Sequence, residues 1–242
     1  MVTVLDTPDQ VARVAAERFV NLASQSIADH SWFNVALSGG STPKAVYELL
    51  AGSPYRDQID WYRTHIFFGD ERCVPWDDPD SNYRMAREAL LARVLVPAEN
   101  VYPMKGDGDP DTNAQAYEQT LRSFFHELEW PRFDLTFLGL GEDGHTASLF
   151  PETAALREER AWVVANWVEK LKSHRITLTA PAINYSQQIL FLVTGEKKAM
   201  PLAKIIYGPR EPERLPAQLI QPVDGSLEWL VDSAAASRLS ST

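Results

Sequence analysis

Cysteine is nearly absent from this sequence, since Cys73 is the single one among 242 residues. One thiol excludes a disulfide framework within the chain and any site that holds a metal through several cysteines, and it is typical of a reducing compartment. The five histidines are scattered, with no pair at the spacing of two metal ligands on a helix. We therefore expect no metal.

Positive charge is also scarce: the chain has 23 Lys and Arg residues but 33 Asp and Glu residues, so the formal net charge is -10. The chain has no Lys/Arg cluster of the kind that neutralises phosphate backbones, which disfavours nucleic acid and anionic membrane surfaces as partners. We expect no nucleic acid and no membrane as partners. An anionic ligand would therefore have to bind in a local pocket.

Long apolar runs are missing, because no stretch approaches the roughly 18 residues of a membrane span. The beginning of the chain, MVTVLDTPDQ, carries Asp6 and Asp9 where a signal peptide requires a basic start and an apolar core. We expect a cytoplasmic protein. Internal repeats and long Gly/Ser linkers are absent too, so we expect residues 1–242 to form a single domain with a sizeable core.

Strand and helix patterns alternate along the chain, which predicts an α/β fold. The near-continuous apolar strands favour a mostly parallel sheet flanked by helices on both faces. Expected strands cover residues 33–37, 65–69, 133–140, 162–166, 175–179, 187–195 and 227–232. Expected helices begin after Thr7-Pro8 and Thr42-Pro43 and cover residues 81–94, 111–128 and 197–206. In an open α/β sheet, ligands bind beyond the carboxyl ends of the strands, so the loops there are the candidate sites.

The first such loop is SGGSTP, residues 38–43, between a strand and a helix. Backbone N–H groups at a helix N-terminus attract anions, and the paired Gly39 and Gly40 allow a phosphate to approach while Ser41 and Thr42 offer hydroxyl donors. The same residues fit a tight turn in which Thr42 caps the helix. The spacing is not that of a P-loop.

The second loop, Gly69-Asp70-Glu71-Arg72, directly follows the apolar run IFF. A guanidinium at the end of a buried strand presents a fixed fork to a substrate oxygen, and Asp70 is expected to orient Arg72. The alternative interpretation is a surface ion pair.

The third loop lies within FDLTFLGLGEDGHTASLFP, residues 133–151. Its glycines spell GxGxxG, but a dinucleotide fingerprint opens a helix and has an acid at the end of the next strand, which here ends in Ala165-Asn166. We reject that interpretation. The turn instead presents His145, with Asp143 two residues before it, as a general base held by a carboxylate. A structural histidine bonded to backbone is the alternative.

Two further sets of charged residues are candidate sites. Asp107, Asp109, Asp111 and Glu118 occupy EF-hand positions, but Thr112 stands where that loop needs glycine, so an acidic loop that caps the next helix fits better. Basic residues near predicted strand ends, if two of them converge on SGGST, would make a phosphate site. They are Lys170, Lys172, His174, Arg175, Lys197 and Lys198.

Taken together, LSGGSTP, FFGDERCVP with SNYRMARE, LGLGEDGHTASLFP, RITLT and TGEKKA resemble the 6-phosphogluconolactonase family in order and spacing over nearly the whole chain. The GxGxDGHTASLFP stretch is the specific element, because SGGSTP and the basic residues are shared with sugar-phosphate isomerases. The resemblance implies a Rossmann-like, doubly wound α/β fold and hydrolysis of 6-phosphoglucono-δ-lactone in the oxidative pentose phosphate pathway. It implies no cofactor and no metal, and we expect a monomer that binds this small-molecule sugar-phosphate lactone.

Carried over residue by residue, the resemblance implies that His145 is the general base and that Arg72 is the arginine of the family's DER motif. From the motifs themselves we add Asp143 and Asp70 to the expected catalytic residues. The implied phosphate-binding residues are Gly40, Ser41, Thr42, Arg175 and Lys198, with Lys197 as the competitor of Lys198. Gly39, beside them in the same loop, is also expected to bind substrate. One departure is Glu152, where many members have glycine.

A δ-lactone is an activated ester, so water deprotonated by His145 can attack C1, and Arg72 or backbone N–H groups can stabilise the oxyanion. Two other functions stay open. Glucosamine-6-phosphate deaminases are similar in fold and phosphate site, but they typically have Glu-Pro where this chain has Phe150-Pro151. A sugar-phosphate sensor that binds without turnover is the other, although no basic recognition helix is present.

Overall fold

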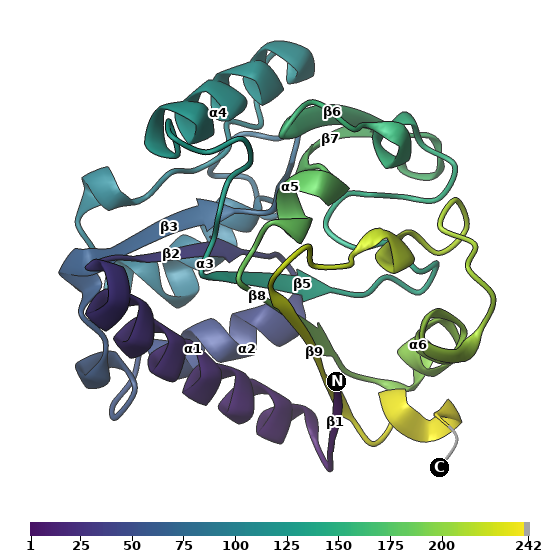
Figure 1. The fold of residues 1–242 in the computed structure, drawn as a ribbon, viewed down its shortest axis with the longest axis horizontal. Helices are drawn as coiled ribbons and strands as arrows, with labels where there is room; N and C mark the ends of the chain where they lie inside the picture. The colour runs from purple at the N-terminus through teal and green to yellow at the C-terminus, as the bar shows by residue number, and fades with distance from the viewer. Residues whose placement is uncertain (240–242) are drawn as a thin grey trace.

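A computed structural model describes residues 1–239 (Figure 1). Within this range a six-stranded sheet has the order β1-β9-β8-β5-β2-β3, and each neighbouring pair is parallel. Its strands are β1 (Val2–Leu5), β2 (Phe33–Leu37), β3 (Thr64–Phe68), β5 (Leu135–Gly139), β8 (Gln188–Val193) and β9 (Ser226–Asp232). The predicted α/β class with a mostly parallel sheet flanked by helices is confirmed.

The strand order contains a switch point. From β2 the chain moves outward to β3, then returns to β5 on the other side of β2. The connections from β2 and from β5 therefore leave in opposite directions at the same edge, which opens a crevice between their carboxyl ends. The SGGSTP loop follows β2 and the GLGEDGH loop follows β5, so the fold brings these two motifs together.

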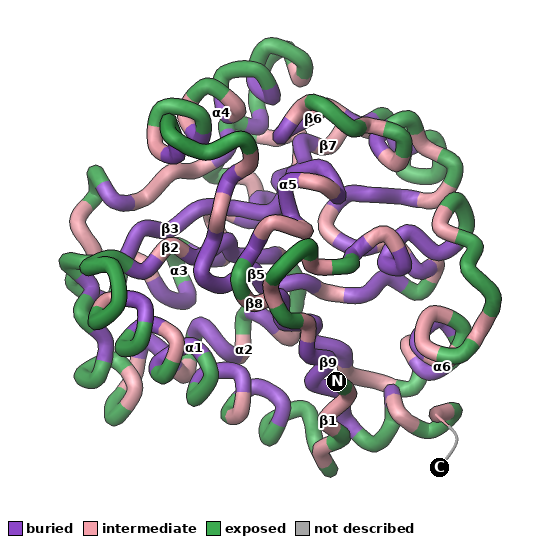
Figure 2. Tube along the Cα trace, in the orientation of Figure 1, coloured by how far each residue is buried: buried purple, intermediate pink, exposed green. Residues whose placement is uncertain are grey.

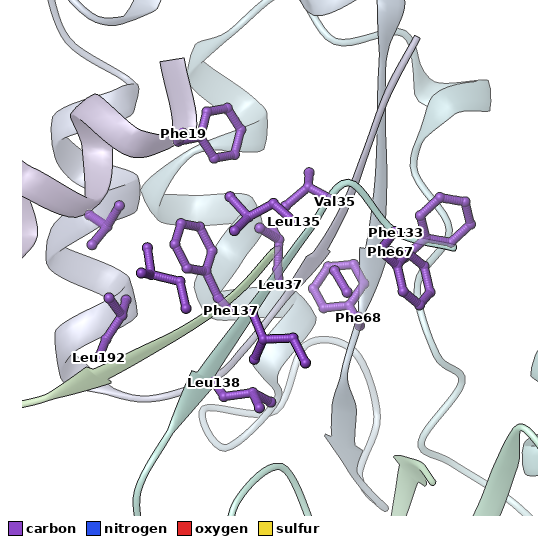
Figure 3. Close-up of a cluster of buried hydrophobic side chains, with 14 of the residues drawn as sticks. Phe19, Val35, Leu37, Phe67, Phe68, Phe133, Leu135, Phe137, Leu138 and Leu192 are labelled. Carbon is purple, nitrogen blue, oxygen red and sulfur yellow. The ribbon is translucent and has the colours of Figure 1, made fainter. Parts of the chain in front are cut away.

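Helices cover both faces of the sheet. They are α1 (Pro8–His30), α2 (Ser41–Leu50), α3 (Asn82–Ala89), α4 (Pro110–Phe124), α5 (Ala180–Asn184) and α6 (Ala199–Tyr207). Phe19 of α1 packs against Phe137 with ring centroids 6.2 Å apart, whereas Phe67 packs against Phe133 at 5.4 Å on the other face (Figure 3). This two-sided burial is the reason why the strands are apolar at successive positions. Figure 2 shows the strands buried and the outward side of α1 exposed.

Local sequence signals explain how several helices begin. Thr7 caps α1 by accepting a hydrogen bond from the N–H of Gln10, and Pro8 follows at the first helical position, as predicted. Asp109 caps α4 through the N–H of Thr112, so the interpretation of the acidic loop as a helix cap is confirmed. Along residues 1–239, no helix has both the length and the apolar character that a membrane crossing requires.

A second, antiparallel sheet has the order β4-β7-β6, with β4 (Asp70–Arg72), β6 (Val163–Val168) and β7 (Ser173–Leu178). The interpretation of residues 70–72 as a loop is wrong, because their backbone pairs with β7. Gly69 links the two sheets: its N–H donates to Leu37 and its carbonyl accepts from Leu178. The strand β1 was also not predicted; it is a four-residue run that pairs with β9 at the sheet edge.

Candidate active site

A pocket lies at the switch point and has two adjoining lobes of about 250 Å³ and 370 Å³. This is the size range of small-molecule sites. The first lobe is lined by residues 38–43 and by Asn82, Gly139 and Thr194, and the second by Glu142, Asp143, Ser148, Lys170 and Arg175. Both lobes share Asp70, Arg72, Gly141, His145, Ala147 and Lys198. The candidate residues of three separate motifs therefore meet in one place.

The N-terminus of α2 forms one wall of the first lobe. Gly40 stands at the N-cap position with φ 109°, a conformation that favours glycine, and no side chain in the described part of the chain caps this helix. Thr42 does not cap α2, so that interpretation is wrong; its hydroxyl bonds the hydroxyl of Thr194 at 2.7 Å. The N–H groups of the first turn face the ligand space without a capping partner, which is the arrangement that binds anions.

His145 is held from two sides. Its Nδ1 hydrogen-bonds the carboxylate of Asp143, and its ring stacks on Phe150 with centroids 4.0 Å apart and planes 21° from parallel. The Nε2 atom has no hydrogen-bond partner within residues 1–239 and belongs to a ring that lines both lobes. A histidine fixed at Nδ1 by a carboxylate presents Nε2 as the acceptor for a substrate proton.

Asp143 also binds Lys170, whose Nζ lies 3.2 Å from Oδ2. Burial acts to raise the pKa of the Asp143 carboxyl, but the hydrogen bond and charge of His145 and the hydrogen bond from Lys170 outweigh it, so this pKa is lowered. The carboxylate is therefore ionised at neutral pH. An ionised carboxylate in this position can orient the imidazole and would stabilise the cation if His145 took a proton.

The glycines around His145 have a steric role. A Cβ on Gly141 would lie 2.0 Å from His145 Nδ1, a distance that no real contact allows. The loop doubles back on itself because Gly141 N–H donates to the His145 carbonyl at 2.8 Å. No helix begins directly after Gly144, since the next helical turn in the described chain is the 3-10 helix Ala154–Arg157, in agreement with our rejection of a dinucleotide fingerprint.

Asp70 does not orient Arg72, contrary to our expectation. Its carboxylate accepts hydrogen bonds from Ser148 Oγ at 2.6 Å and Asn82 Nδ2 at 3.3 Å, whereas the Arg72 guanidinium donates to the carbonyl of Asp80. The reason is the strand geometry: Asp70 and Arg72 are paired with Thr177 and Arg175 of β7, so their backbone is fixed and each side chain bonds the loop nearest to it.

Glu71 is fully buried and binds the beginning of α3. Its carboxylate accepts hydrogen bonds from the N–H groups of Asn82 and Tyr83 at 2.6 and 2.8 Å and from Ser81 Oγ at 3.0 Å. Burial raises the pKa of Glu71, and these hydrogen bonds oppose the rise. The alternative interpretation of this motif as a surface ion pair is therefore wrong.

Arg175 and Lys198 contribute positive charge to the pocket. Burial, followed by the charge of Arg72, lowers the pKa of Arg175. Burial likewise lowers the pKa of Lys198, against the opposite influence of Glu142 and Asp143. Lys198 lines both lobes, whereas Lys197 lines neither and lies 3.7 Å from Glu142. Between these two lysines, the geometry favours Lys198 as the ligand-facing one.

Three residues of this site were not predicted as functional from the sequence: Asn82, Ser148 and Thr194. Lys170 was one of six basic candidates for a phosphate site, and the structure pairs it with Asp143. Asn82 and Ser148 lie in the quoted SNYRMARE and GHTASLFP motifs, but only the fold shows that both bind Asp70. Among the described residues, no group of three or more His, Cys, Asp or Glu side chains is arranged to hold a metal ion.

The fold and pocket define a class: an α/β protein with a switch-point site in which a helix N-terminus and a histidine–carboxylate pair face the same ligand space. The family model described as glucosamine-6-phosphate isomerases/6-phosphogluconolactonase matches residues 6–229. The chain belongs to this family, and the predicted resemblance is confirmed.

Relatives within the family have the same extent as this chain. This chain is 45% identical over 221 residues to a 6-phosphogluconolactonase of Synechocystis sp.. The alignment covers 89% of this chain and 88% of that protein. The chain is 41% identical to one of Nostoc sp., covering 98% of each. The three-dimensional structure of 6-phosphogluconolactonase from Trypanosoma brucei superposes with a TM-score of 0.87 at 29% identity, covering 99% of this chain and 98% of that one.

Proposed function

We propose that this protein hydrolyses 6-phospho-D-glucono-1,5-lactone to 6-phospho-D-gluconate, a reaction of the oxidative pentose phosphate pathway. The observation that carries the proposal is the position of His145, whose ring lines both the lobe that contains the α2 N-terminus and the lobe that contains Asp143. One ligand with a phosphate at one end and a reactive carbonyl at the other fits such a site. The Synechocystis and Nostoc relatives carry the name of this activity.

In the proposed reaction, His145 Nε2 takes a proton from a water molecule as the water oxygen attacks C1 of the lactone. The carbonyl π electrons move to oxygen, and Arg72 stabilises the resulting oxyanion. When the tetrahedral intermediate collapses, the bond between C1 and the ring oxygen breaks, and the imidazolium returns its proton to that oxygen. The product is an open-chain hydroxy acid, which ionises to the carboxylate.

Substrate binding positions C1 over the base. The phosphate lies against the N–H groups at the beginning of α2, where Gly40, Ser41 and Thr42 surround it and Lys198 supplies a countercharge. A fixed phosphate restricts the ring to the neighbourhood of His145, which is catalysis by positioning. A local anion site of this kind allows a protein of net charge -10 to bind an anionic substrate.

The reaction is tested by generating the lactone in situ from glucose 6-phosphate and following its disappearance with and without the protein. The lactone decays spontaneously, so each progress curve is compared with the uncatalysed one at the same pH. We expect the protein to accelerate the decay in proportion to its concentration. A folded protein with no effect on the decay would refute the proposed function.

Assays on the same protein distinguish the lactonase from two other functions, a deaminase and a sugar-phosphate sensor. A deaminase would release ammonia from glucosamine 6-phosphate; here Phe150 stands where those enzymes typically have a glutamate, and its ring stacks on His145. We expect no ammonia. A sensor would bind 6-phosphogluconate, measured by calorimetry, without accelerating lactone decay.

A further inference from the structure

Two arginines of the pocket face each other across the small antiparallel sheet. Arg72 of β4 and Arg175 of β7 are directly opposite in register, so their side chains leave the same face of the sheet. Like charges in this position repel each other and destabilise the pair. Neither guanidinium forms a salt bridge with any carboxylate of residues 1–239. The pair therefore has no salt-bridge partner in this part of the chain, although the charges of Asp70 and Asp80 act on Arg175 from nearby.

Both guanidinium groups are nevertheless fixed in place. Arg72 donates from Nη1 to the Asp80 carbonyl, and Arg175 donates from Nη1 to Ser173 Oγ at 2.8 Å and to the His174 carbonyl at 2.9 Å. Their Nε and Nη2 atoms have no partner in the described chain. Two anchored forks with unused donors are suited to a planar carboxylate.

The location of Arg175 separates it from the phosphate-binding loop. Arg175 lines the second lobe together with Asp143 and His145, but it does not line the first lobe, which contains residues 38–43. Arg72 lines both lobes. If the phosphate occupies the first lobe, Arg175 lies at the end of the ligand where C1 reacts.

We propose that Arg175, together with Arg72, binds the C1 carboxylate of the product, and that it is a specificity-determining residue for the reacting end of the substrate rather than part of the phosphate site. This rests on the proposed function. C1 of the lactone is uncharged, becomes an oxyanion during attack, and ends as a carboxylate. The two arginines gain an ionic partner only when negative charge develops at C1. The arginine pair therefore stabilises the transition state and the product more than the bound lactone.

Two ligands that differ only at C1 test the assignment: 6-phospho-D-gluconate, which has a carboxylate, and D-glucitol 6-phosphate, which has a hydroxymethyl group. Their dissociation constants are measured by calorimetry on the wild type, Arg175→Gln and Ser41→Ala. We expect the wild type to bind 6-phospho-D-gluconate at least about tenfold more tightly than D-glucitol 6-phosphate, because only the former accepts a charge-assisted hydrogen bond at C1. Arg175→Gln should reduce this ratio to about threefold or less, whereas Ser41→Ala should weaken both ligands equally.

Equal weakening of both ligands in Arg175→Gln would show that Arg175 binds phosphate and would overturn the inference, as would an unchanged ratio. If Arg175→Gln does not fold, Arg175→Lys replaces it, because lysine keeps the positive charge but lacks the planar guanidinium. The preference for 6-phospho-D-gluconate over D-glucitol 6-phosphate must then fall, while the affinity for D-glucitol 6-phosphate is retained. A wild type that neither binds 6-phosphogluconate nor hydrolyses the lactone would refute the proposed function itself. A wild type that hydrolyses the lactone but shows no preference between the two ligands would refute only this inference.

Discussion

The imidazole of His145 lies against Gly141 so closely that a Cβ at residue 141 would stand 2.0 Å from Nδ1 and 2.7 Å from Asp143 Oδ1. Glycine at this position is therefore a requirement of the histidine–carboxylate pair and not of a bound nucleotide. The pair is built by its own loop, whose turn is closed by the hydrogen bond from Gly141 to the His145 carbonyl.

The first prediction follows directly. Gly141→Ala should lower kcat by about a hundredfold or more with a smaller change in KM, because the methyl group displaces the His145 ring while the α2 phosphate site is unchanged. Gly52→Ala is the control, since a Cβ there meets nothing closer than 3.6 Å. Steady-state kinetics on both variants would contradict the account if Gly141→Ala kept its kcat.

A second prediction concerns acid stability. Because the pKa of Asp143 is lowered in the folded protein, its ionised form stabilises the fold above the unfolded carboxyl pKa of about 4, and this contribution is lost as the pH falls through the lowered folded value. Asp143→Asn should therefore cost about 1–2 kcal/mol of unfolding free energy at pH 7 and progressively less below pH 4. Urea unfolding at several pH values measures it, and a difference that grows toward acid would be the wrong sign.

Thiol reactivity provides a third prediction. Burial raises the pKa of Cys73 to about 11, with Glu71 adding to the rise and Arg175 opposing it. Since the thiolate is the reactive form, modification of native protein by a thiol reagent at pH 7.5 should be more than about tenfold slower than in urea. Absorbance assays with a disulfide reagent measure both rates, and equal rates would contradict the raised pKa of the half-buried Cys73.

The fourth prediction concerns the departure at Glu152, which has φ 61°. A left-handed conformation costs a residue with a Cβ about 1 kcal/mol, and this explains why glycine suits the position. Glu152→Gly should leave the unfolding free energy unchanged or raise it by up to about 1 kcal/mol. Gln119→Gly, in the exposed middle of α4, should lower it by about 1 kcal/mol. Equal losses in both variants would contradict the backbone argument.

The sequence predicted the parallel strands well because two-sided burial makes them apolar at nearly every position, as in β2, β3, β5 and β8. It did not predict β4, since Asp70–Arg72 is polar and its strand character comes from pairing with β7, a partner about a hundred residues away. The single domain and the monomer stay predictions.

For the site, local motifs identified Asp143, His145 and residues 38–42, because a turn and a helix N-terminus are determined by neighbours in sequence. The predicted contacts of Asp70 with Arg72 and of Thr42 as a helix cap were wrong for the opposite reason. Each has a partner from a distant loop, Ser148 and Thr194 respectively, and single-sequence patterns carry no information on such pairs.

The central claim is that His145 activates water for attack on the lactone. The measurement that tests it most directly is the rate of enzymatic decay of 6-phosphoglucono-δ-lactone in His145→Ala, compared with the wild type and with His126→Ala, whose side chain is exposed on the surface. The account predicts a loss of a hundredfold or more in kcat for His145→Ala, in line with the usual contribution of about 10²–10⁴ from a general base, and wild-type turnover for His126→Ala. Near-normal turnover by folded His145→Ala would contradict it.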